Sequence, residues 1–375
     1  MTRSTTLALV LALAACGDDT SNKTPDGALP DAPPAVPRAV VVSGNFMPGQ
    51  PGVMSSLDLG TTTVAQRVAP NGAVAEDPMV RHFGDELFVV NRASGNNVTI
   101  LNASTFALVE QLATGAGSNP QDVAVVGGKL YVPGFGTAGV VVVPRGGGAP
   151  TTIDLSALDP DGKPDCVSAF AVGTNVFVAC ELLDETFTPR GPGKIVVIDT
   201  ATDTVKGAPL TLTNVNPFGV FERMPEDQGG DLVIPTVSFA DGSGCIERVT
   251  TGATPTAPGC LVQNQALGGF AARTAFQDVG GMPVMWVVSS SFGANGPVGA
   301  LRAFDLTTKM LVSGTVTPAT QLIVDVVGCP DGSVVVSDQT MAANGLRVYN
   351  GTTEKTTAPL AIGLAPNSNH GLVCY

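Results

Sequence analysis

The chain has 375 residues, of which 44% are hydrophobic and only 14% are charged, and it contains 45 glycines and 29 prolines. This composition is too apolar for a disordered chain and too rich in Gly and Pro for one built of long helices, so it predicts a large all-β protein. The formal net charge of -13, without any cluster of Lys and Arg, argues against nucleic-acid binding, because the chain would repel phosphate backbones.

The N-terminus predicts an export signal over residues 1–15. One basic residue, Arg3, precedes an apolar run that is too short to span a bilayer, which is typical of a secretory signal. The sequence Leu-Ala-Ala-Cys that ends at Cys16 resembles the lipobox of bacterial lipoproteins. This resemblance implies that the signal is cleaved before Cys16 and that Cys16 is lipidated; the alternative is a simple secretory signal with an incidental cysteine.

Residues 16–37 predict a flexible tether between the lipid and a folded domain. The segment is rich in Pro, Asp and Gly and poor in residues that could join a core. Gly17 follows the cysteine, and by resemblance to the sorting rule of enterobacterial lipoproteins it favours the outer membrane. We therefore expect the lipid to anchor the protein there, facing either the periplasm or the cell surface.

A turn motif, in which Asp or Asn is followed three residues later by Thr, recurs after apolar strand-like runs. An Asx side chain accepts a nearby backbone N–H and so pre-forms such a turn. Neighbouring copies lie about 45 residues apart, and a period of this length with about four strands per unit is typical of a β-propeller. The five copies are Asp58–Thr61, Asn102–Thr105, Asp199–Thr202, Asp305–Thr308 and Asn350–Thr353.

The period divides residues 38–375 into seven units. Residues 38–70 supply three strands without an inner strand, and the C-terminal segment NHGLVCY supplies one strand without partners. We expect this last strand to complete the first blade, which leaves no unpaired edge at the seam. The expected fold is therefore all-β, a single seven-bladed β-propeller over residues 38–375. Its six undivided units are 78–119, 120–165, 166–216, 217–269, 270–321 and 322–362.

The repeat resembles a known family. The pattern Pro-x-x-Val-Ala-Val followed by Lys-Leu-Tyr-Val within residues 120–132, and KIVVIDTATDTV at 194–205, are similar to the YVTN-type repeats of seven-bladed propellers in bacterial surface and periplasmic proteins. The resemblance covers most of residues 38–375. Other propeller families fit less well, because the one tryptophan cannot supply the Trp-Asp of each WD40 blade or the docking motifs of quinoprotein dehydrogenases.

The cysteines predict disulfides. Lipidation of Cys16 would leave six, an even number that suits an oxidising compartment. The best supported pair is symmetric about a hairpin turn near Gly252, and a pair at the seam would form if the ring closes there. A metal site is the alternative, although no Cys-x-x-Cys spacing occurs, and the connectivity beyond the first pair stays open. The expected pairs are Cys245–Cys260, Cys166–Cys180 and Cys329–Cys374.

The chain has few candidates for catalysis. Its two histidines, His82 and His370, exclude a His-rich metal centre, and neither a nucleophile elbow nor a Walker-type phosphate loop is present. Propeller geometry places a site where the inner strands begin, at one mouth of the axial channel. Carboxylates and amides there could bind Ca²⁺ or a polar ligand, or could act only as turn residues. The candidates are Asp77, Asn119, Gln121, Asp122, Asp165, Asn216, Gln321, Asn367, Asn369 and His370.

These observations favour a non-enzymatic binding module for a protein, a peptide or an envelope polymer, presented as a monomeric propeller with no required cofactor. The loops at 181–193 and 289–297 would form a rim for such a partner at the same face. One alternative is a lactonase-like hydrolase that uses His370 as general base together with Asp122. Another is a structural component of a surface layer.

Overall fold

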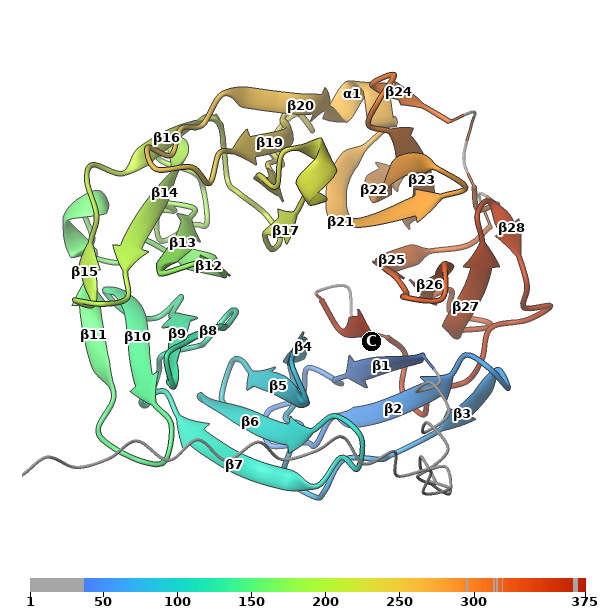
Figure 1. Ribbon diagram of the computed structural model, residues 1–375, viewed down its shortest axis with the longest axis horizontal. Coiled ribbons are helices and arrows are strands. Elements are labelled where there is room, and N and C mark those ends of the chain that lie inside the picture. Colours follow the sequence, from blue (N-terminus) through green and yellow to red (C-terminus); the bar gives the residue numbers. More distant parts are fainter. Residues whose placement is uncertain (1–36, 295, 313, 315, 319, 367–369) are drawn as a thin grey trace, which may run out of the picture. The chain divides into compact units, whose positions relative to one another are not determined.

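The structure, a computed structural model, describes residues 37–294, 296–312, 314, 316–318, 320–366 and 370–375. The expected signal peptide, Cys16 and nearly all of the expected tether lie outside these residues, as do Asn367 and Asn369. The described chain forms a ring of seven antiparallel sheets around a central axis (Figure 1). The prediction of a seven-bladed β-propeller is therefore confirmed.

The strands of each blade are given from the axis outward. Blade 1 comprises β29 (Leu372–Cys374), β1 (Arg38–Ser43), β2 (Val53–Asp58) and β3 (Thr63–Ala65). Blade 2 comprises β4 (Pro78–Phe83), β5 (Glu86–Asn91), β6 (Asn97–Asn102) and β7 (Leu108–Ala113). Blade 3 comprises β8 (Ala124–Val126), β9 (Lys129–Pro133), β10 (Gly139–Pro144) and β11 (Thr151–Asp154). Blade 4 comprises β12 (Cys166–Val172), β13 (Asn175–Cys180) and β14 (Pro192–Asp199), with β15 (Thr204–Val205) and β16 (Leu210–Val215) both paired to β14.

Blades 5 to 7 follow the same order. Blade 5 comprises β17 (Glu222–Arg223), β18 (Leu232–Pro235), β19 (Cys245–Val249) and β20 (Gly259–Gln263). Blade 6 comprises β21 (Phe270–Val279), β22 (Met282–Gly293), β23 (Gly296–Asp305) and β24 (Met310–Leu311). Blade 7 comprises β25 (Ile323–Gly328), β26 (Ser333–Asp338), β27 (Gly345–Asn350) and β28 (Thr353–Glu354).

Among the described residues, helical structure is confined to short turns. These are α1 (Asn264–Leu267), η1 (Ser156–Leu158) and η2 (Glu226–Gln228). Within the described ranges, none of the helices has the length and apolar character needed to cross a membrane.

The hydrophobic core lies between neighbouring blades. Strand β10 shows why its four consecutive valines are all buried: Val140 and Val142 pack toward blade 4, whereas Val141 and Val143 pack toward blade 2. Successive side chains of a strand point to opposite faces of the sheet. Since both faces of a blade are covered by its neighbours, an unbroken apolar run replaces the alternation of an exposed sheet.

The ring closes at blade 1, as the sequence predicts. Strand β29 pairs with β1 in an antiparallel register that sets Val373 opposite Val40. Arg38 and Tyr375 exchange backbone hydrogen bonds of 2.8 and 3.0 Å, and the N–H of Val42 donates to the carbonyl of Gly371 at 2.7 Å. The last residues of the chain therefore supply the inner strand of the first blade.

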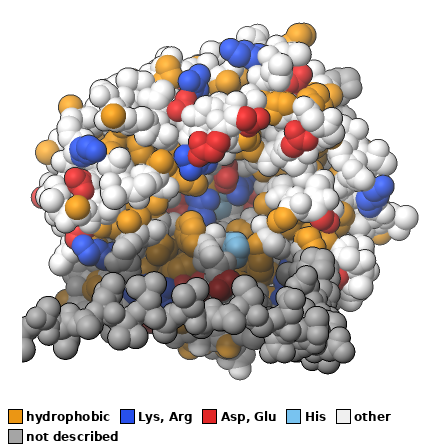
Figure 2. Space-filling view, viewed as in Figure 1, with side chains coloured by type: hydrophobic (Ala, Val, Ile, Leu, Met, Phe, Trp, Pro, Cys, Tyr) orange, Lys and Arg blue, Asp and Glu red, His pale blue; other side chains and the backbone are white. Residues whose placement is uncertain are grey.

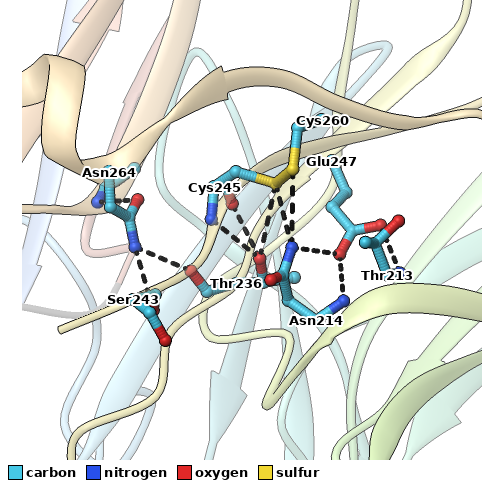
Figure 3. Close-up of a disulfide and its surroundings, with 9 residues drawn as sticks. Thr213, Asn214, Thr236, Ser243, Cys245, Glu247, Cys260 and Asn264 are labelled. Atoms are coloured by element: carbon cyan, nitrogen blue, oxygen red, sulfur yellow. Dashed lines mark hydrogen bonds between the residues drawn. A yellow bond between two sulfur atoms is a disulfide. The ribbon is translucent and has the colours of Figure 1, made fainter. Parts of the chain in front are cut away.

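Three disulfides occur among the described residues, at the three expected pairings. Cys329–Cys374 joins blade 7 to the closing strand β29. Cys245–Cys260 joins β19 to β20 within blade 5 (Figure 3). Beside it, the buried carboxylate of Glu247 accepts backbone hydrogen bonds of 2.8 Å from Thr213 and 2.7 Å from Asn214, which ties blade 5 to blade 4 (Figure 3).

Candidate functional site

Four of the predicted site residues occupy equivalent positions at the start of their blades. The backbone carbonyl of each accepts a hydrogen bond from a residue just after the second strand of the same blade. Three of the four, Asn119, Asp165 and Asn216, have φ between 44° and 51°, a left-handed conformation that Asn and Asp adopt more readily than most residues. These residue types therefore have a local structural reason. The hydrogen bonds join Arg92 to Asp77 (3.0 Å), Phe135 to Asn119 (3.1 Å), Glu181 to Asp165 (3.0 Å) and Val237 to Asn216 (3.1 Å).

A belt of buried charged side chains crosses the axial channel. Arg81 on β4 donates two hydrogen bonds of 2.8 Å to Asp122, and its Nη1 lies 3.6 Å from Oε1 of Glu222. Arg273 on β21 pairs with the same Glu222 and, at 3.0 Å, with Asp325. Blades 2 and 5 lie across the ring from one another (Figure 1), so the contact between Arg81 and Glu222 spans the axis.

A cavity of about 300 Å³, here called the axial cavity, lies at the mouth where the inner strands begin. Val167 and Ala272 contribute to its lining. The next residue along each strand reaches the belt: Ser168 donates a hydrogen bond to Asp122, and Arg273 is itself part of the belt. The belt therefore forms the floor of the cavity. Seen along the axis, the centre of the ring is hollowed, and basic, acidic and histidine side chains are visible in the hollow among apolar ones (Figure 2).

The polar side chains of the axial cavity include several without partners. Glu181 is 6% exposed, and its carboxyl forms neither a hydrogen bond nor an ion pair with any residue that the structure describes. The ring of His370, 7% exposed, likewise has no hydrogen-bond partner within the described ranges, and its Nδ1 is buried. Arg92 pairs with Asp77, but its Nε is also buried without a partner there. Such groups can form hydrogen bonds to a ligand without breaking any within the protein.

The environment disfavours the charged form of both Glu181 and His370. Burial, and then the negative charge of Asp165, raise the pKa of Glu181 well above its ordinary value. Burial, and then the positive charges of Arg273, Arg81 and Arg92, hold the pKa of His370 well below its ordinary value. At neutral pH the cavity therefore presents a neutral imidazole, while proton binding to Glu181 is favoured.

The disulfide of blade 4 lies next to two acidic residues, Asp165 and Glu181, of which Glu181 lines the axial cavity. Cys166 and Cys180 are bonded to each other, and they directly precede or follow Asp165 and Glu181 in the chain. Burial raises the pKa of Asp165 to about 6, although its Oδ2 accepts a hydrogen bond of 2.8 Å from the backbone N–H of Leu183. The cross-link thus fixes the two strand ends that carry these acids.

The other predicted candidates are placed differently. Asn216 and Gln121 line the axial cavity together with His370. Asp122 is fully buried in the belt, away from the cavity lining. The side chain of Asn119 accepts from the backbone N–H of Ala93 at 2.8 Å and stabilises a loop. Asn369 lies outside the described residues.

Glu181 and the phenylalanines at the cavity mouth were not predicted as site residues from the sequence. Glu181 directly follows the buried run VFVAC, and an acidic residue at the end of a buried strand could have marked it as a candidate site residue. Single phenylalanines also occur among glycines and polar residues at or just after the ends of the second strands of several blades, as in PGFG, VSFADG and SSSFG. The recurrence of one apolar residue at these strand ends is a pattern that the sequence alone contains. The four phenylalanines that line the cavity are Phe135, Phe187, Phe218 and Phe239.

The described residues contain no group of three or more His, Cys, Asp or Glu side chains that could hold a metal ion.

Comparison with known proteins shows the fold alone. No protein-family model matches the sequence, and no curated protein matches it. The structure is similar to that of apo AztD from Citrobacter koseri, with a TM-score of 0.56 and 12% identity over 90% of this chain and 97% of that one. It is similar to Kuenenia stuttgartiensis hydrazine synthase, with a TM-score of 0.52 and 14% identity over 78% of this chain and 89% of that one. It is also similar to dihydro-heme d1 dehydrogenase NirN in complex with DHE, with a TM-score of 0.52 and 14% identity over 92% of this chain and 76% of that one.

Proposed function

We propose that this chain is an exported binding protein, anchored by a lipid on Cys16, whose propeller takes up a small ligand in the axial cavity. The observation that carries the proposal is a pair of largely buried side chains in one cavity of the described chain: His370, whose Nδ1 is buried without a partner there, and Glu181, whose carboxyl has no hydrogen-bond partner among the described residues. Burying a polar group without a hydrogen bond costs roughly 1–3 kcal/mol. A ligand that completes these hydrogen bonds explains why the fold retains both groups.

The size of the cavity favours a small molecule or one unit of an envelope polymer. Its volume of about 300 Å³ lies at the lower end of the range of ligand-binding pockets. A folded protein partner would contact the rim and not enter the cavity.

Binding is favoured over hydrolysis by the state of Asp122. A lactonase-like site needs this carboxylate free to act with His370, but its oxygens accept hydrogen bonds from Arg81 at 2.8 Å and from the Ser168 hydroxyl at 2.9 Å. The backbone N–H groups of Val123 and Ala169 also donate to it. Asp122 therefore serves the belt.

The sequence around Cys16 supports export and anchoring. The three disulfides of the described chain support an oxidising compartment, because such bonds persist in exported proteins and are rare in the cytosol. The outer membrane is the proposed location, by the resemblance at Gly17.

The test is native mass spectrometry of residues 17–375, the chain without the lipidated Cys16 and here called the mature chain, exported behind a cleavable secretory signal. This form keeps the whole described propeller, which closes on itself through β29. We expect a native mass above the denatured mass, and Glu181→Leu should abolish the excess. Glu185→Leu, at an exposed position on the same loop, is the matched control and should keep it. An empty native protein, or an excess that survives Glu181→Leu, would overturn the proposal.

A further inference from the structure

Six phenylalanines lie at the mouth of the axial cavity or beside it, and four of them line the cavity. They come from blades 3 to 6, and they make up six of the 15 phenylalanines in the chain. Three of them are strongly exposed: Phe187 by 71%, Phe239 by 53% and Phe292 by 77%. Contiguous exposed apolar surface of this kind marks a binding site more often than isolated apolar residues do. The six are Phe135, Phe187, Phe218, Phe239, Phe270 and Phe292.

Beside the axial cavity lies a second space of about 330 Å³, here called the apolar chamber. It shares Phe218, Phe239 and Ala272 with the lining of the axial cavity, so the two spaces lie side by side. The rest of its lining comes from blades 6 and 7, and most of it is apolar. None of its lining residues is charged. A ligand group in this chamber must therefore be uncharged and largely apolar.

The aromatic wall of the apolar chamber is preformed. Phe239 meets Phe218 at 5.2 Å between ring centroids and 84° between planes, and it meets Phe270 at 5.5 Å and 86°. Phe270 in turn lies 6.3 Å from Phe292. Edge-to-face pairs of this geometry are favourable, so the rings position one another and leave their outer faces available. A ring of the ligand would extend the same packing.

We propose that the ligand is amphipathic, with an aromatic ring system in the apolar chamber and an uncharged hydrogen-bonding end beside Glu181 and His370 in the axial cavity. This inference rests on the proposed function and adds the chemical class of the ligand. Phe239 lines both spaces, so it lies where the two parts of the ligand join. Together the spaces match the size of pockets that hold molecules of several rings.

A neighbouring hollow of about 720 Å³ lies against the same phenylalanines and needs its own control. It shares Phe239, Phe270 and Phe292 with the apolar chamber, but Gln265 lines the hollow and not the chamber. Gln265 is exposed, so replacing it should leave the fold intact.

The test uses N-phenyl-1-naphthylamine, an uncharged aromatic amine that fluoresces in apolar surroundings. The dye is titrated into the mature chain after its retained ligand has been removed by unfolding in urea and refolding with the disulfides intact. We expect saturable binding of one dye per chain. Phe292→Ala should weaken it by about three- to tenfold, the loss expected for one aromatic contact. Gln265→Ala and Met341→Ala, the second at a position 97% exposed in another loop, should change it by less than about twofold.

The outcomes separate this inference from the proposed function. If Phe292→Ala leaves dye binding unchanged, or if Gln265→Ala weakens it equally, the apolar chamber is not the site and the inference is wrong. In that case a retained mass that depends on Glu181 would still support ligand binding in the axial cavity. Phe187→Ala, which alters the lining of the axial cavity only, should reduce the retained mass more than it reduces dye binding. The reverse order would overturn the placement of the two ends.

Discussion

Replacing Glu181 by leucine should stabilise the ligand-free protein while it removes binding. Leucine is close in size to glutamate, and the segment continues with Leu182 and Leu183, which are also buried. No described residue donates a hydrogen bond to the Glu181 carboxyl, so the substitution leaves no group within the described ranges newly unpaired. A residue kept for stability would give the opposite result.

The expected gain follows from the burial of the carboxyl. A polar group buried without a hydrogen bond costs roughly 1–3 kcal/mol, and because the Glu181 carboxyl still reaches the cavity surface, leucine recovers part of this cost. The raised pKa of Glu181 adds a dependence on pH, because the folded protein holds this proton more tightly than the unfolded chain does. The free energy of unfolding of the wild type therefore falls as pH rises from about 4.3, the ordinary pKa, toward the folded pKa. The leucine variant lacks this contribution, so its advantage should grow with pH.

Urea unfolding of the ligand-free mature chain at about pH 4.5 and about pH 7.5 measures this difference. Since 1 kcal/mol shifts the melting temperature of a large domain by roughly 2–4 °C, the melting temperature of Glu181→Leu should exceed that of the wild type by several degrees at the higher pH. Glu185→Leu, at an exposed position, should change stability by less than about 0.5 kcal/mol. A loss of stability in Glu181→Leu, or a gain that shrinks with pH, would show that the carboxyl has favourable partners and would refute the reasoning.

Three further predictions concern the seam, the belt and the anchor. Replacing Cys329 and Cys374 together by serine should lower the free energy of unfolding by about 4 kcal/mol, the loop-closure value for their separation of 45 residues, as measured by urea unfolding. Arg273→Met should lower the free energy of unfolding by about 3–5 kcal/mol in the same assay, because it leaves Asp325 buried without its cation. An unchanged free energy of unfolding would show that the ion pairs of the belt do not stabilise the fold. Cys16→Ser should abolish incorporation of a labelled fatty acid in cells, and labelling that persists would exclude lipidation at this residue.

The blade arrangement could be predicted because its signals are local. Asp58 and Asn102 accept the backbone N–H of Thr61 and Thr105 at 2.8 and 2.9 Å, so at these copies the residues of the motif themselves form the turn. Ring closure then follows from an unpaired final strand, and the seam disulfide follows from ring closure.

The direction of individual side chains at the axis could not be predicted in the same way. Asp122 looks like a ligand residue in the sequence, yet it points into the belt, because a shift of one residue along an inner strand turns a side chain from one face to the other. The significance of Glu181 depends on the absence of partners from residues distant in the chain. Neither property can be inferred from a local sequence pattern, whereas the left-handed conformation of Asn119 and Asp165 can.

The belt also determines how a ligand would be oriented. Because Arg81 and Glu222 meet across the axis, the channel is occupied below the axial cavity, and a ligand has to enter and leave through the aromatic mouth. The arginines of the belt act on His370 at the cavity and help to keep its imidazole neutral, so an uncharged hydrogen-bonding group is favoured at the bottom. The phenylalanines then contact whatever part of the ligand remains near the surface. One set of buried ion pairs thus closes the channel and sets the polarity of the site above it.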